Sequence, residues 1–502
     1  MIDRTPAMIN CLLVLIGMIM AHESRALPPS QNANMPSSDS CVPFLMPDPE
    51  ALFNSSKKVF AHYFYPFPLS MQNKSPSDDY YNANYLNKNG ESGKWLAKGG
   101  FLRQRPLPIG VNSESNWRQS NMQQEVRMAI SRGITGFSID IMSPKDVAGA
   151  DSHLQQLLSA AQSVDKRFKI LVMPDIAALK ADADTVVKVI AAAAASPAAY
   201  RIADGRLAVS AFNAGANSPD WWSGVFGQLK SRGIAVAFVP TFLGWKGQAS
   251  AFAPISYGFA DWGTATAHAA ESMKGDPDIA HKQYGKIYMM PVDPQQYRPK
   301  DSIYWEAGNS AAFRNAWMSA INGGADWVQL VTWSDFSESS QIQPYTDATL
   351  GRDIGTGFYN LNAYFATWFL TGKQPTITHD VLYYFYRREP TNAASAAQSA
   401  PNKIVNSAPE DNVEVLAFLT APGELKITIA GQSATQNAPA GLTSFKVPTA
   451  AGTPVFSLTR GGSQVFSFPG PVQIFGSGGL PSGIIDMTYW SGSGSKNGVC
   501  AF

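Results

Sequence analysis

Short apolar runs and longer amphipathic segments alternate along the first three quarters of the chain. The short runs are rich in β-branched and aromatic residues and predict buried strands. Segments with an apolar residue every three or four positions predict helices instead. We predict strands at 58–65, 134–141, 168–173, 206–212, 234–239, 255–259, 286–290 and 327–333. We predict helices at 117–132, 154–161, 182–195, 220–232, 311–322 and 360–370.

This alternation predicts the fold class of the first part of the chain. Eight apolar strands that alternate with amphipathic helices are typical of an α/β protein with a (β/α)8 TIM barrel. The count of eight includes the short run 255–259, and a doubly wound open sheet is the alternative. The segment 66–116, after the first strand, is polar and aromatic. A structureless loop of that length is uncommon, so we expect a functional flap on the active-site face.

The pattern changes after residue 375. The chain of 502 residues is too long for one ordinary core, so a second domain is expected. Its short alternating runs are separated by Pro, Gly, Ser and Asn and predict an antiparallel β-sandwich. We therefore assign a barrel domain to 27–375 and a β-sandwich domain to 376–502, with a loop at 391–408. The predicted strands of the second domain are 381–386, 413–419, 424–429, 454–458 and 463–468.

The first 26 residues have the pattern of a secretory signal peptide. Arg4 precedes an apolar run at 11–21, and Ser24-Arg25-Ala26 supplies small residues of the kind a signal peptidase reads. A run of about this length is too short to cross a bilayer. We expect cleavage after Ala26 and a secreted protein without a membrane anchor, or a periplasmic one in a Gram-negative source.

Removal of residues 1–26 would also remove Cys11 and leave Cys41 and Cys500 as the remaining cysteines. Two cysteines in an oxidising compartment predict one disulfide, which would join the two ends of the mature chain. Two buried thiols are the alternative.

Composition excludes several classes of function. Charged residues make up 15% of the chain, the formal net charge is +1, and no Lys/Arg run occurs. Neither nucleic acid nor an anionic membrane is therefore an expected partner. The six His have no metal-ligand spacing, and no nucleotide-binding or esterase motif occurs. We expect no metal, no cofactor and a monomer.

Acidic and aromatic residues gather at the predicted C-terminal ends of the strands, where α/β barrels place active sites. After the strand that ends at Trp333, a polar loop carries Asp335 and Glu338. Two carboxyl groups can hydrolyse a glycosidic bond, and aromatic faces can stack on sugar rings. Capping of a turn is the alternative role for two acids at this spacing. We predict Asp335 and Glu338 as catalytic residues, and His62, Tyr65, Asp140, Asp175, Asp261, Trp262 and Trp333 as substrate-binding residues.

Four motifs resemble, in their order along the chain, those of glycoside hydrolase family 71, the α-1,3-glucanases or mutanases. The resemblance covers about residues 57–375. It implies a (β/α)8 barrel, endo-hydrolysis of α-1,3-glucan with inversion, and catalytic acids at Asp335 and Glu338. The motifs are Val59-Phe-Ala-His-Tyr63, Gly133-Ile-Thr-Gly-Phe137, Tyr288-Met-Met-Pro-Val292 and Thr332-Trp-Ser-Asp-Phe-Ser-Glu-Ser339.

Departures from the family pattern concern the substrate more than the reaction. The family usually has Asn-Asp-Tyr-Gly-Glu-Ser-His-Tyr where this chain has Ser334-Asp-Phe-Ser-Glu-Ser-Ser-Gln341, and an Asn where it has Asp140. A glycosidase for another α-glycan, such as an α-mannan or a mixed α-glucan, is one alternative. A polysaccharide-binding protein without activity is the other.

The resemblance also leads to expectations about the two acids themselves. An inverting pair needs about 6.5–9.5 Å between its carboxyl groups, whereas a regular helix would place side chains three residues apart closer together. We therefore expect the segment with Asp335 and Glu338 to be non-helical. Glu338 has the longer side chain and is the expected acid, and Asp335 is the expected base.

Overall fold

The computed structural model describes residues 41–147, 149, 152–263, 265–347, 354–394, 403–405, 407–480 and 482–500. The predicted signal peptide, residues 1–26, lies outside the described residues. So does half of the predicted loop 391–408, because residues 395–402 and 406 are not described. In the described part of the chain, no helix combines the length and the hydrophobicity needed to cross a membrane.

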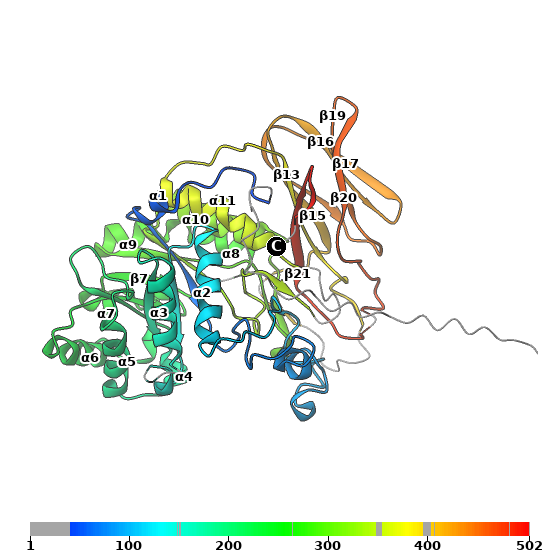
Figure 1. The fold of residues 1–502 in the computed structure, drawn as a ribbon. Coiled ribbons are helices and arrows are strands. Elements are labelled where there is room, and N and C mark those ends of the chain that lie inside the picture. Colours follow the sequence, from blue (N-terminus) through cyan, green and yellow to red (C-terminus); the bar gives the residue numbers. More distant parts are fainter. Residues whose placement is uncertain are drawn as a thin grey trace, which may run out of the picture. The chain divides into compact units, whose positions relative to one another are not determined.

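Eight parallel strands form a closed barrel in the order β1-β11-β8-β7-β6-β5-β4-β3 (Figure 1). The first and last strands close it, with Lys58 opposite Trp327 and Phe60 opposite Gly136. The predicted barrel is therefore confirmed, and closure excludes the open doubly wound sheet. The strands are β1 (Lys58–Tyr63), β3 (Gly136–Ile141), β4 (Lys169–Pro174), β5 (Leu207–Ala211), β6 (Val236–Phe242), β7 (Gly258–Asp261), β8 (Ile287–Val292) and β11 (Trp327–Leu330).

Helices connect the barrel strands, and most begin at a residue that caps them. The Asp182 side chain accepts a hydrogen bond from the Thr185 amide, and Ser218 does the same for Trp221, which satisfies amides at the helix start. The six predicted helices are α2 (Trp117–Ile130), α3 (His153–Val164), α5 (Ala183–Ala194), α6 (Pro219–Ser231), α10 (Ala311–Gly323) and α11 (Gly357–Thr371). Further helices are α1 (Pro49–Phe53), α4 (Ile176–Leu179), α7 (Ala249–Phe252), α8 (Ala267–Ser272) and α9 (Asp276–Tyr284).

The segment 66–116 contains a short π-helix, η2 (Tyr81–Tyr85), and a two-residue strand, β2 (Arg105–Pro106). β2 pairs with β12 (Tyr345–Thr346), which follows the loop that carries Asp335 and Glu338. A second small sheet contains β9 (Gln296–Arg298), β10 (Ile303–Trp305) and β14 (Lys403–Val405). Both small sheets lie in connections outside the barrel strands.

The C-terminal part of the chain forms two antiparallel sheets, in agreement with the predicted fold class. One has the order β18-β15-β13-β21-β22 and the other the order β17-β16-β19-β20. Tyr384 of β13 stacks on Phe456 of β19 at 5.4 Å between ring centroids, which joins the sheets. The strands are β13 (Val381–Arg387), β15 (Asn412–Leu419), β16 (Gly423–Ile429), β17 (Gln432–Ala438), β18 (Gly441–Pro448), β19 (Val455–Arg460), β20 (Ser463–Pro469), β21 (Tyr489–Ser495) and β22 (Gly498–Val499).

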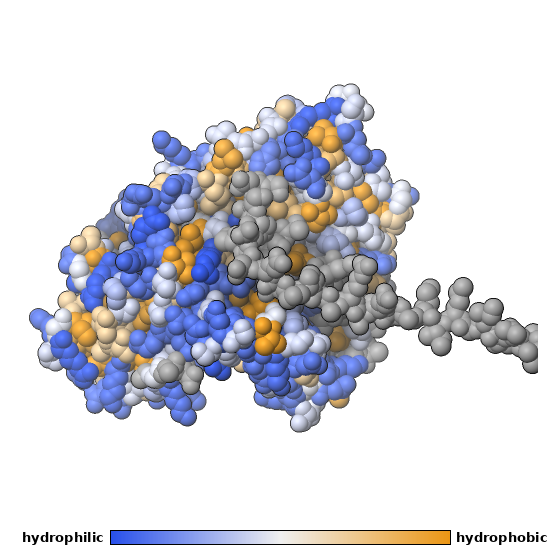
Figure 2. All heavy atoms as spheres, viewed as in Figure 1, coloured by the Kyte–Doolittle hydropathy of each residue, from blue (hydrophilic) through white to orange (hydrophobic). Residues whose placement is uncertain are grey.

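Apolar and polar contacts connect this region with the barrel. Phe358 and Phe385 lie 5.0 Å apart, and Tyr364 and Phe418 lie 4.9 Å apart. The face shown in Figure 2 carries only small groups of hydrophobic residues among hydrophilic ones.

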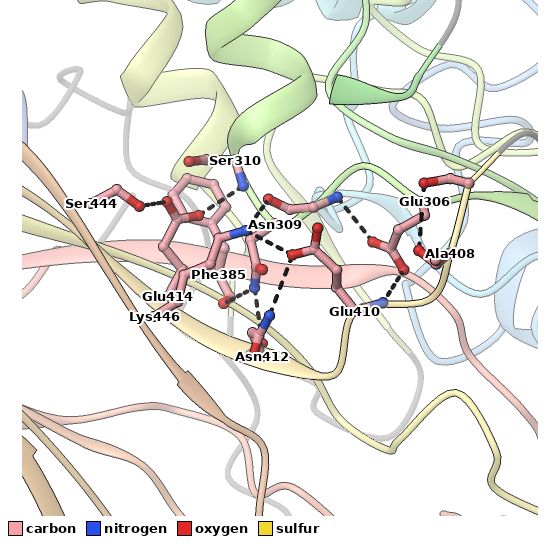
Figure 3. Close-up of polar contacts among 12 residues, drawn as sticks. Glu306, Asn309, Ser310, Phe385, Ala408, Glu410, Asn412, Glu414, Ser444 and Lys446 are labelled. Carbon is pink, nitrogen blue, oxygen red and sulfur yellow. Dashed lines mark hydrogen bonds and ion pairs between the residues drawn. The ribbon is translucent and has the colours of Figure 1, made fainter. Parts of the chain in front are cut away.

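The polar contacts between barrel and sheets centre on the loop before α10 (Figure 3). Asn309 donates to the carbonyl oxygens of Phe385 and Asn412, at 2.9 Å each. Glu414 accepts hydrogen bonds from the Ser310 amide at 2.8 Å and the Ser444 hydroxyl at 2.6 Å. This loop is therefore attached to three strands of one sheet, β13, β15 and β18.

Cys41 and Cys500 lie next to one another, as the predicted disulfide requires. The pKa of the Cys500 thiol is raised, mainly by its hydrogen bond with the Cys41 side chain and to a smaller extent by burial. Backbone contacts fix both residues: the Tyr383 hydroxyl donates to the Cys41 carbonyl and the Cys500 amide donates to Ser493, at 2.9 and 2.8 Å. The bridge itself stays a prediction.

We expect denatured, unreduced protein without residues 1–26 to contain no titratable thiol. Cys41→Ser should lower the free energy of unfolding by about 2–5 kcal/mol, because a cross-link between distant residues restricts the unfolded chain. Cys500→Ser should have the same effect, and the double variant should be no less stable than either single variant. Two titratable thiols in the denatured protein would contradict the bridge.

Candidate active site

The loop after β11 carries the two predicted catalytic acids at the C-terminal end of the barrel, and we name it the catalytic loop for that prediction alone. It forms turns rather than a helix from Val331 to Ser340, as expected. Oδ1 of Asp335 accepts hydrogen bonds from the Ser337 amide at 2.9 Å, the Ser337 hydroxyl at 2.7 Å and the Glu338 amide at 3.1 Å. The turn-capping role therefore applies to one oxygen of Asp335. It also fixes the direction in which Oδ2 points.

Burial makes Asp335 an unusual carboxyl group. Only 7% of the surface of Asp335 is exposed to solvent. Burial, and then the negative charge of Glu338, raise the pKa of Asp335 to about 7, against the opposing effect of the hydrogen bonds from Ser337 and Glu338. A carboxyl group with this pKa is protonated in a large fraction of molecules at neutral pH, so it can give up a proton.

Glu338 has different surroundings, which come from strand β9. Arg298 Nη2 lies 2.8 Å from Glu338 Oε1, and Gln296 Nε2 donates to Glu338 Oε2 at 2.5 Å. The Tyr297 amide donates to the Glu338 carbonyl at 2.8 Å. A guanidinium and an amide donor on the two oxygens suit an ionised carboxylate. The loop thus holds two acids in contrasting environments, which is the usual basis for separate acid and base roles.

Asp293 is a third acid at this end of the barrel, and it is not among the site residues predicted from the sequence. It directly follows β8 and is 4% exposed. Its Oδ2 has no hydrogen-bond partner among the described residues, and a Cβ on Gly263 would lie 1.7 Å from that oxygen. Burial, and then the charge of Glu338, raise the pKa of Asp293 well above its usual value. The predicted strand ends at residue 290, three residues too early for Asp293 to stand out as a strand-end acid.

His62 and Asp140 lie together on neighbouring strands. Nε2 of His62 is 3.8 Å from Oδ2 of Asp140, which is too long for a hydrogen bond. Burial lowers the pKa of His62 to about 3. Burial, and then the charges of Asp175 and Asp335, raise the pKa of Asp140. The His62 ring is therefore uncharged at neutral pH, so the two side chains form no ion pair, and each can hydrogen-bond a neutral ligand.

Trp262 is one of two partly accessible aromatic side chains among the predicted site residues. It is half-buried and packs edge-on against His62 and Phe212, with 4.8 Å between ring centroids in each contact. Tyr65, also half-buried, donates to Asp146 and stacks on His153 at 4.3 Å. Both rings are partly exposed, and their role in binding substrate stays a prediction.

Two of the predicted binding acids act as caps in the structure. Asp175 accepts a hydrogen bond from the Ala178 amide at 2.9 Å at the start of α4. Asp261 accepts from the amides of Gly244 at 2.7 Å and Trp262 at 3.1 Å. Asp261 therefore stabilises the turn that carries Trp262, and Asp175 caps the start of helix α4.

Trp333 does not present a face to a ligand, so its prediction as a stacking residue is wrong. Its side chain is 0% exposed. The indole nitrogen donates to Glu125 of α2 at 3.2 Å, and the ring packs against Phe137 at 5.2 Å. Glu125 also accepts from the Tyr63 hydroxyl at 2.8 Å. Trp333 thus anchors the start of the catalytic loop to helix α2.

The segment 66–116 packs against the catalytic loop. Phe67 contacts Phe336, which lies between the two acids, with 6.3 Å between ring centroids. Pairing of Arg105 with Thr346 attaches β2 to the chain that follows the loop. The segment therefore supports the loop as well as lying at the active-site end. In the described ranges of the chain, no three His, Cys, Asp or Glu residues are grouped as metal ligands.

The chain is similar to known glucanases. The sequence profile of glycosyl hydrolase family 71 matches residues 110–500. Glucan endo-1,3-alpha-glucosidase agn1 of Schizosaccharomyces pombe is 26% identical over 375 residues, and the match covers 70% of this chain and 86% of that protein. The ascus wall endo-1,3-alpha-glucanase of the same yeast is 24% identical over 400 residues, and the match covers 72% of this chain and 91% of that protein. A mutanase of Penicillium rubens is 25% identical over 214 residues, and the match covers 40% of this chain and 47% of that protein.

Among solved structures, a GH99 endo-alpha-mannosidase from Bacteroides thetaiotaomicron is similar with a TM-score of 0.47 and 16% identity. The match covers 62% of this chain and 97% of that one. The family profile matches more than half of the chain and includes the barrel from α2 onward, the catalytic loop and the C-terminal sheets. The chain is therefore a glycoside hydrolase that belongs to glycosyl hydrolase family 71.

Proposed function

We propose that the protein is a secreted endo-α-1,3-glucanase that cleaves its substrate with inversion at the anomeric carbon. The two yeast relatives named for this linkage support the substrate. The observation that carries the mechanism is the contrast between a buried Asp335 with a raised pKa and a Glu338 paired with Arg298. Acid-assisted glycoside hydrolysis needs one protonated and one ionised carboxyl group at the same bond, in retaining as in inverting enzymes. Inversion is the outcome that the resemblance to the family implies.

These surroundings favour Asp335 as the acid and Glu338 as the base, the reverse of the assignment from side-chain length. Oδ1 of Asp335 is occupied by three donors, so Oδ2 carries the proton. Asp335 gives this proton to the glycosidic oxygen as the bond from that oxygen to C1 breaks. Glu338 takes a proton from a water molecule whose oxygen bonds to C1 from the opposite face. The new reducing end is therefore a β-anomer.

The remaining side chains of the site bind the sugar in this proposal. His62 and Asp140 hydrogen-bond hydroxyls, and Trp262 and Tyr65 contribute ring surface. Secretion rests on the signal pattern of residues 1–26. A polysaccharide of the cell wall is too large to enter a cell, so an enzyme that degrades it acts outside.

The test is incubation of the purified protein with insoluble α-1,3-glucan, with reducing ends measured over time and the first product observed by proton NMR. We expect release of oligosaccharides whose new ends are β-configured before mutarotation. Release from an α-mannan or a mixed α-glucan alone would instead identify another α-glycan hydrolase. Binding to glucan without release would identify a binding protein, and an α-configured first product would contradict inversion.

A further inference from the structure

A pocket with a volume of about 150 Å³ lies between the loops that follow β5 and β6, and we name it the β5–β6 pocket. It is separate from the carboxyl groups of the catalytic loop but opens at the same, C-terminal end of the barrel strands. This volume is well above what one water molecule needs, so the pocket can receive one face of a small ring. Its lining residues are Asn213, Gly215, Ala216, Phe242, Leu243 and Gln248.

The lining combines apolar surface with uncharged polar groups. Phe242 is 1% exposed and forms a buried wall, whereas Leu243 is 64% exposed at the rim. The side-chain amides of Asn213 and Gln248 form no hydrogen bond to any residue that the structure describes. Each amide offers donors and an acceptor. A ligand with hydroxyl groups and an apolar face matches this lining, and the absence of charge in it disfavours phosphates and cations.

The local backbone keeps the pocket open. A Cβ on Gly215 would lie 3.3 Å from Cδ and 3.4 Å from Nε2 of Gln248, so a larger residue would displace that amide. Asn213 has a positive φ of 52°, a conformation that asparagine tolerates better than most residues. The loop geometry thus holds both amides at the pocket.

A series of neighbouring residues leads from the pocket toward the predicted catalytic acids. Phe212, next to Asn213, packs on Trp262 with 4.8 Å between ring centroids, and Trp262 packs on His62 at the same distance. His62 lies 3.8 Å from Asp140, whose pKa the charge of Asp335 helps to raise. The pocket therefore borders the part of the barrel end that carries Trp262 and His62.

We propose that the β5–β6 pocket binds a glucose unit of the same α-glucan chain that is cleaved at Asp335 and Glu338. Leu243 contacts the apolar face of the ring, and Asn213 and Gln248 hydrogen-bond its hydroxyls. The inference rests on the proposed function and adds an outer binding site to it. A glucan chain that extends beyond the units bound at Asp335 and Glu338 would gain affinity from this outer site.

The experiment compares cleavage of soluble α-1,3-linked gluco-oligosaccharides of increasing length. In the wild-type enzyme, kcat/KM should rise with length and include a step at the length that first reaches the pocket. Gln248→Ala should remove that step and lower kcat/KM by roughly two- to tenfold for longer substrates only, as the loss of neutral hydrogen bonds predicts. Ala216→Trp, at an exposed position, should fill the pocket and have the same length-dependent effect.

Gln228→Ala is the matched control, because Gln228 is also half-buried but lies on α6. It should leave every kcat/KM unchanged. Binding to the Asp335→Asn variant, measured by calorimetry, should weaken for long oligosaccharides alone when Gln248→Ala is added. If both pocket variants keep the wild-type length dependence, the pocket binds no part of the substrate. If the wild-type enzyme cleaves no α-1,3-linked oligosaccharide, the proposed function fails and the assignment of the pocket fails with it.

Discussion

Asp335→Asn is expected to lower kcat on α-1,3-glucan by at least roughly 10²-fold, the usual contribution of a positioned general acid. The asparagine side chain keeps the shape of the aspartate and an oxygen for the amides of Ser337 and Glu338, so the turn should survive. It lacks the proton that Asp335 would donate. Glu338→Gln should have an effect of similar size, since glutamine cannot take a proton from water.

A substrate with a better leaving group separates the two roles. Fluoride departs without protonation, so Asp335→Asn should hydrolyse the α-fluoride of an α-1,3-gluco-oligosaccharide at a rate close to that of the wild-type enzyme. Glu338→Gln should remain slow on both substrates, because the attacking water still needs a base. The opposite pattern would restore Glu338 as the acid. Turnover of glucan near the wild-type rate by either variant would remove that residue from the mechanism.

The pH profile gives a further check on Asp335. A general acid acts only while protonated, so kcat/KM on glucan should be retained below the pKa of Asp335, about 7, and should decrease above it. The same alkaline decrease should be absent when Asp335→Asn acts on the fluoride. A wild-type profile that instead increases through pH 7 would contradict the assignment.

Much of the barrel can be predicted because its strands are apolar on both faces. Parallel strands covered by helices form continuous apolar runs, and all eight runs become barrel strands. Helix α9 (Asp276–Tyr284) escapes prediction because it buries only Asp276, Pro277 and Ala280. Its charged residues produce no apolar stripe.

Strand β21 (Tyr489–Ser495) illustrates a different limit. Its Gly/Ser composition is typical of a loop, yet every residue in it is buried. A Cβ on Gly492 would lie 2.1 Å from the Tyr384 hydroxyl, and one on Gly494 would lie 2.5 Å from Phe468. Glycine is thus required by side chains from distant strands, which the local pattern does not contain.

For the site, too, only the features that depend on neighbouring positions in the sequence can be predicted. The positions of Asp335 and Glu338 follow from a strand end and a motif, but the partners that distinguish them come from elsewhere. Arg298 and Gln296 reach Glu338 from β9. The prediction for Trp333 is wrong because aromatic character does not reveal which side of a strand end faces the core. Its contact with Glu125 depends on how helix α2 packs.

Arg387→Met is expected to lower the free energy of unfolding by about 3–5 kcal/mol, as measured by urea denaturation. Arg387 and Glu306 are 4% and 2% exposed, and the guanidinium contacts both carboxylate oxygens, at 3.1 and 3.3 Å. Glu306 also accepts from the Tyr489 hydroxyl at 2.5 Å. Methionine would leave the carboxylate buried without its cation, in a loop that attaches the barrel to the C-terminal sheets.

The stability that Arg387 and Glu306 contribute together should decrease at acidic pH. Burial opposes ionisation of Glu306, but Arg387 and the surrounding donors outweigh it and lower its pKa. A lowered pKa contributes stability that is present above the unfolded value, about 4.3, and is lost as pH falls through the folded value. The difference between wild type and Arg387→Met should therefore be largest at neutral pH and should shrink in acid, where Glu306 is protonated in both proteins.

Two further variants separate the buried charge from general effects of the substitution. Glu306→Gln added to Arg387→Met should recover part of the lost stability, because it removes the uncompensated charge. Lys282→Met breaks an exposed pair with Asp278 and should change the free energy of unfolding by no more than about 0.5 kcal/mol. A similar small change for Arg387→Met would mean that the buried pair contributes little. The attachment of the two regions would then depend on their apolar contacts, such as that between Phe358 and Phe385.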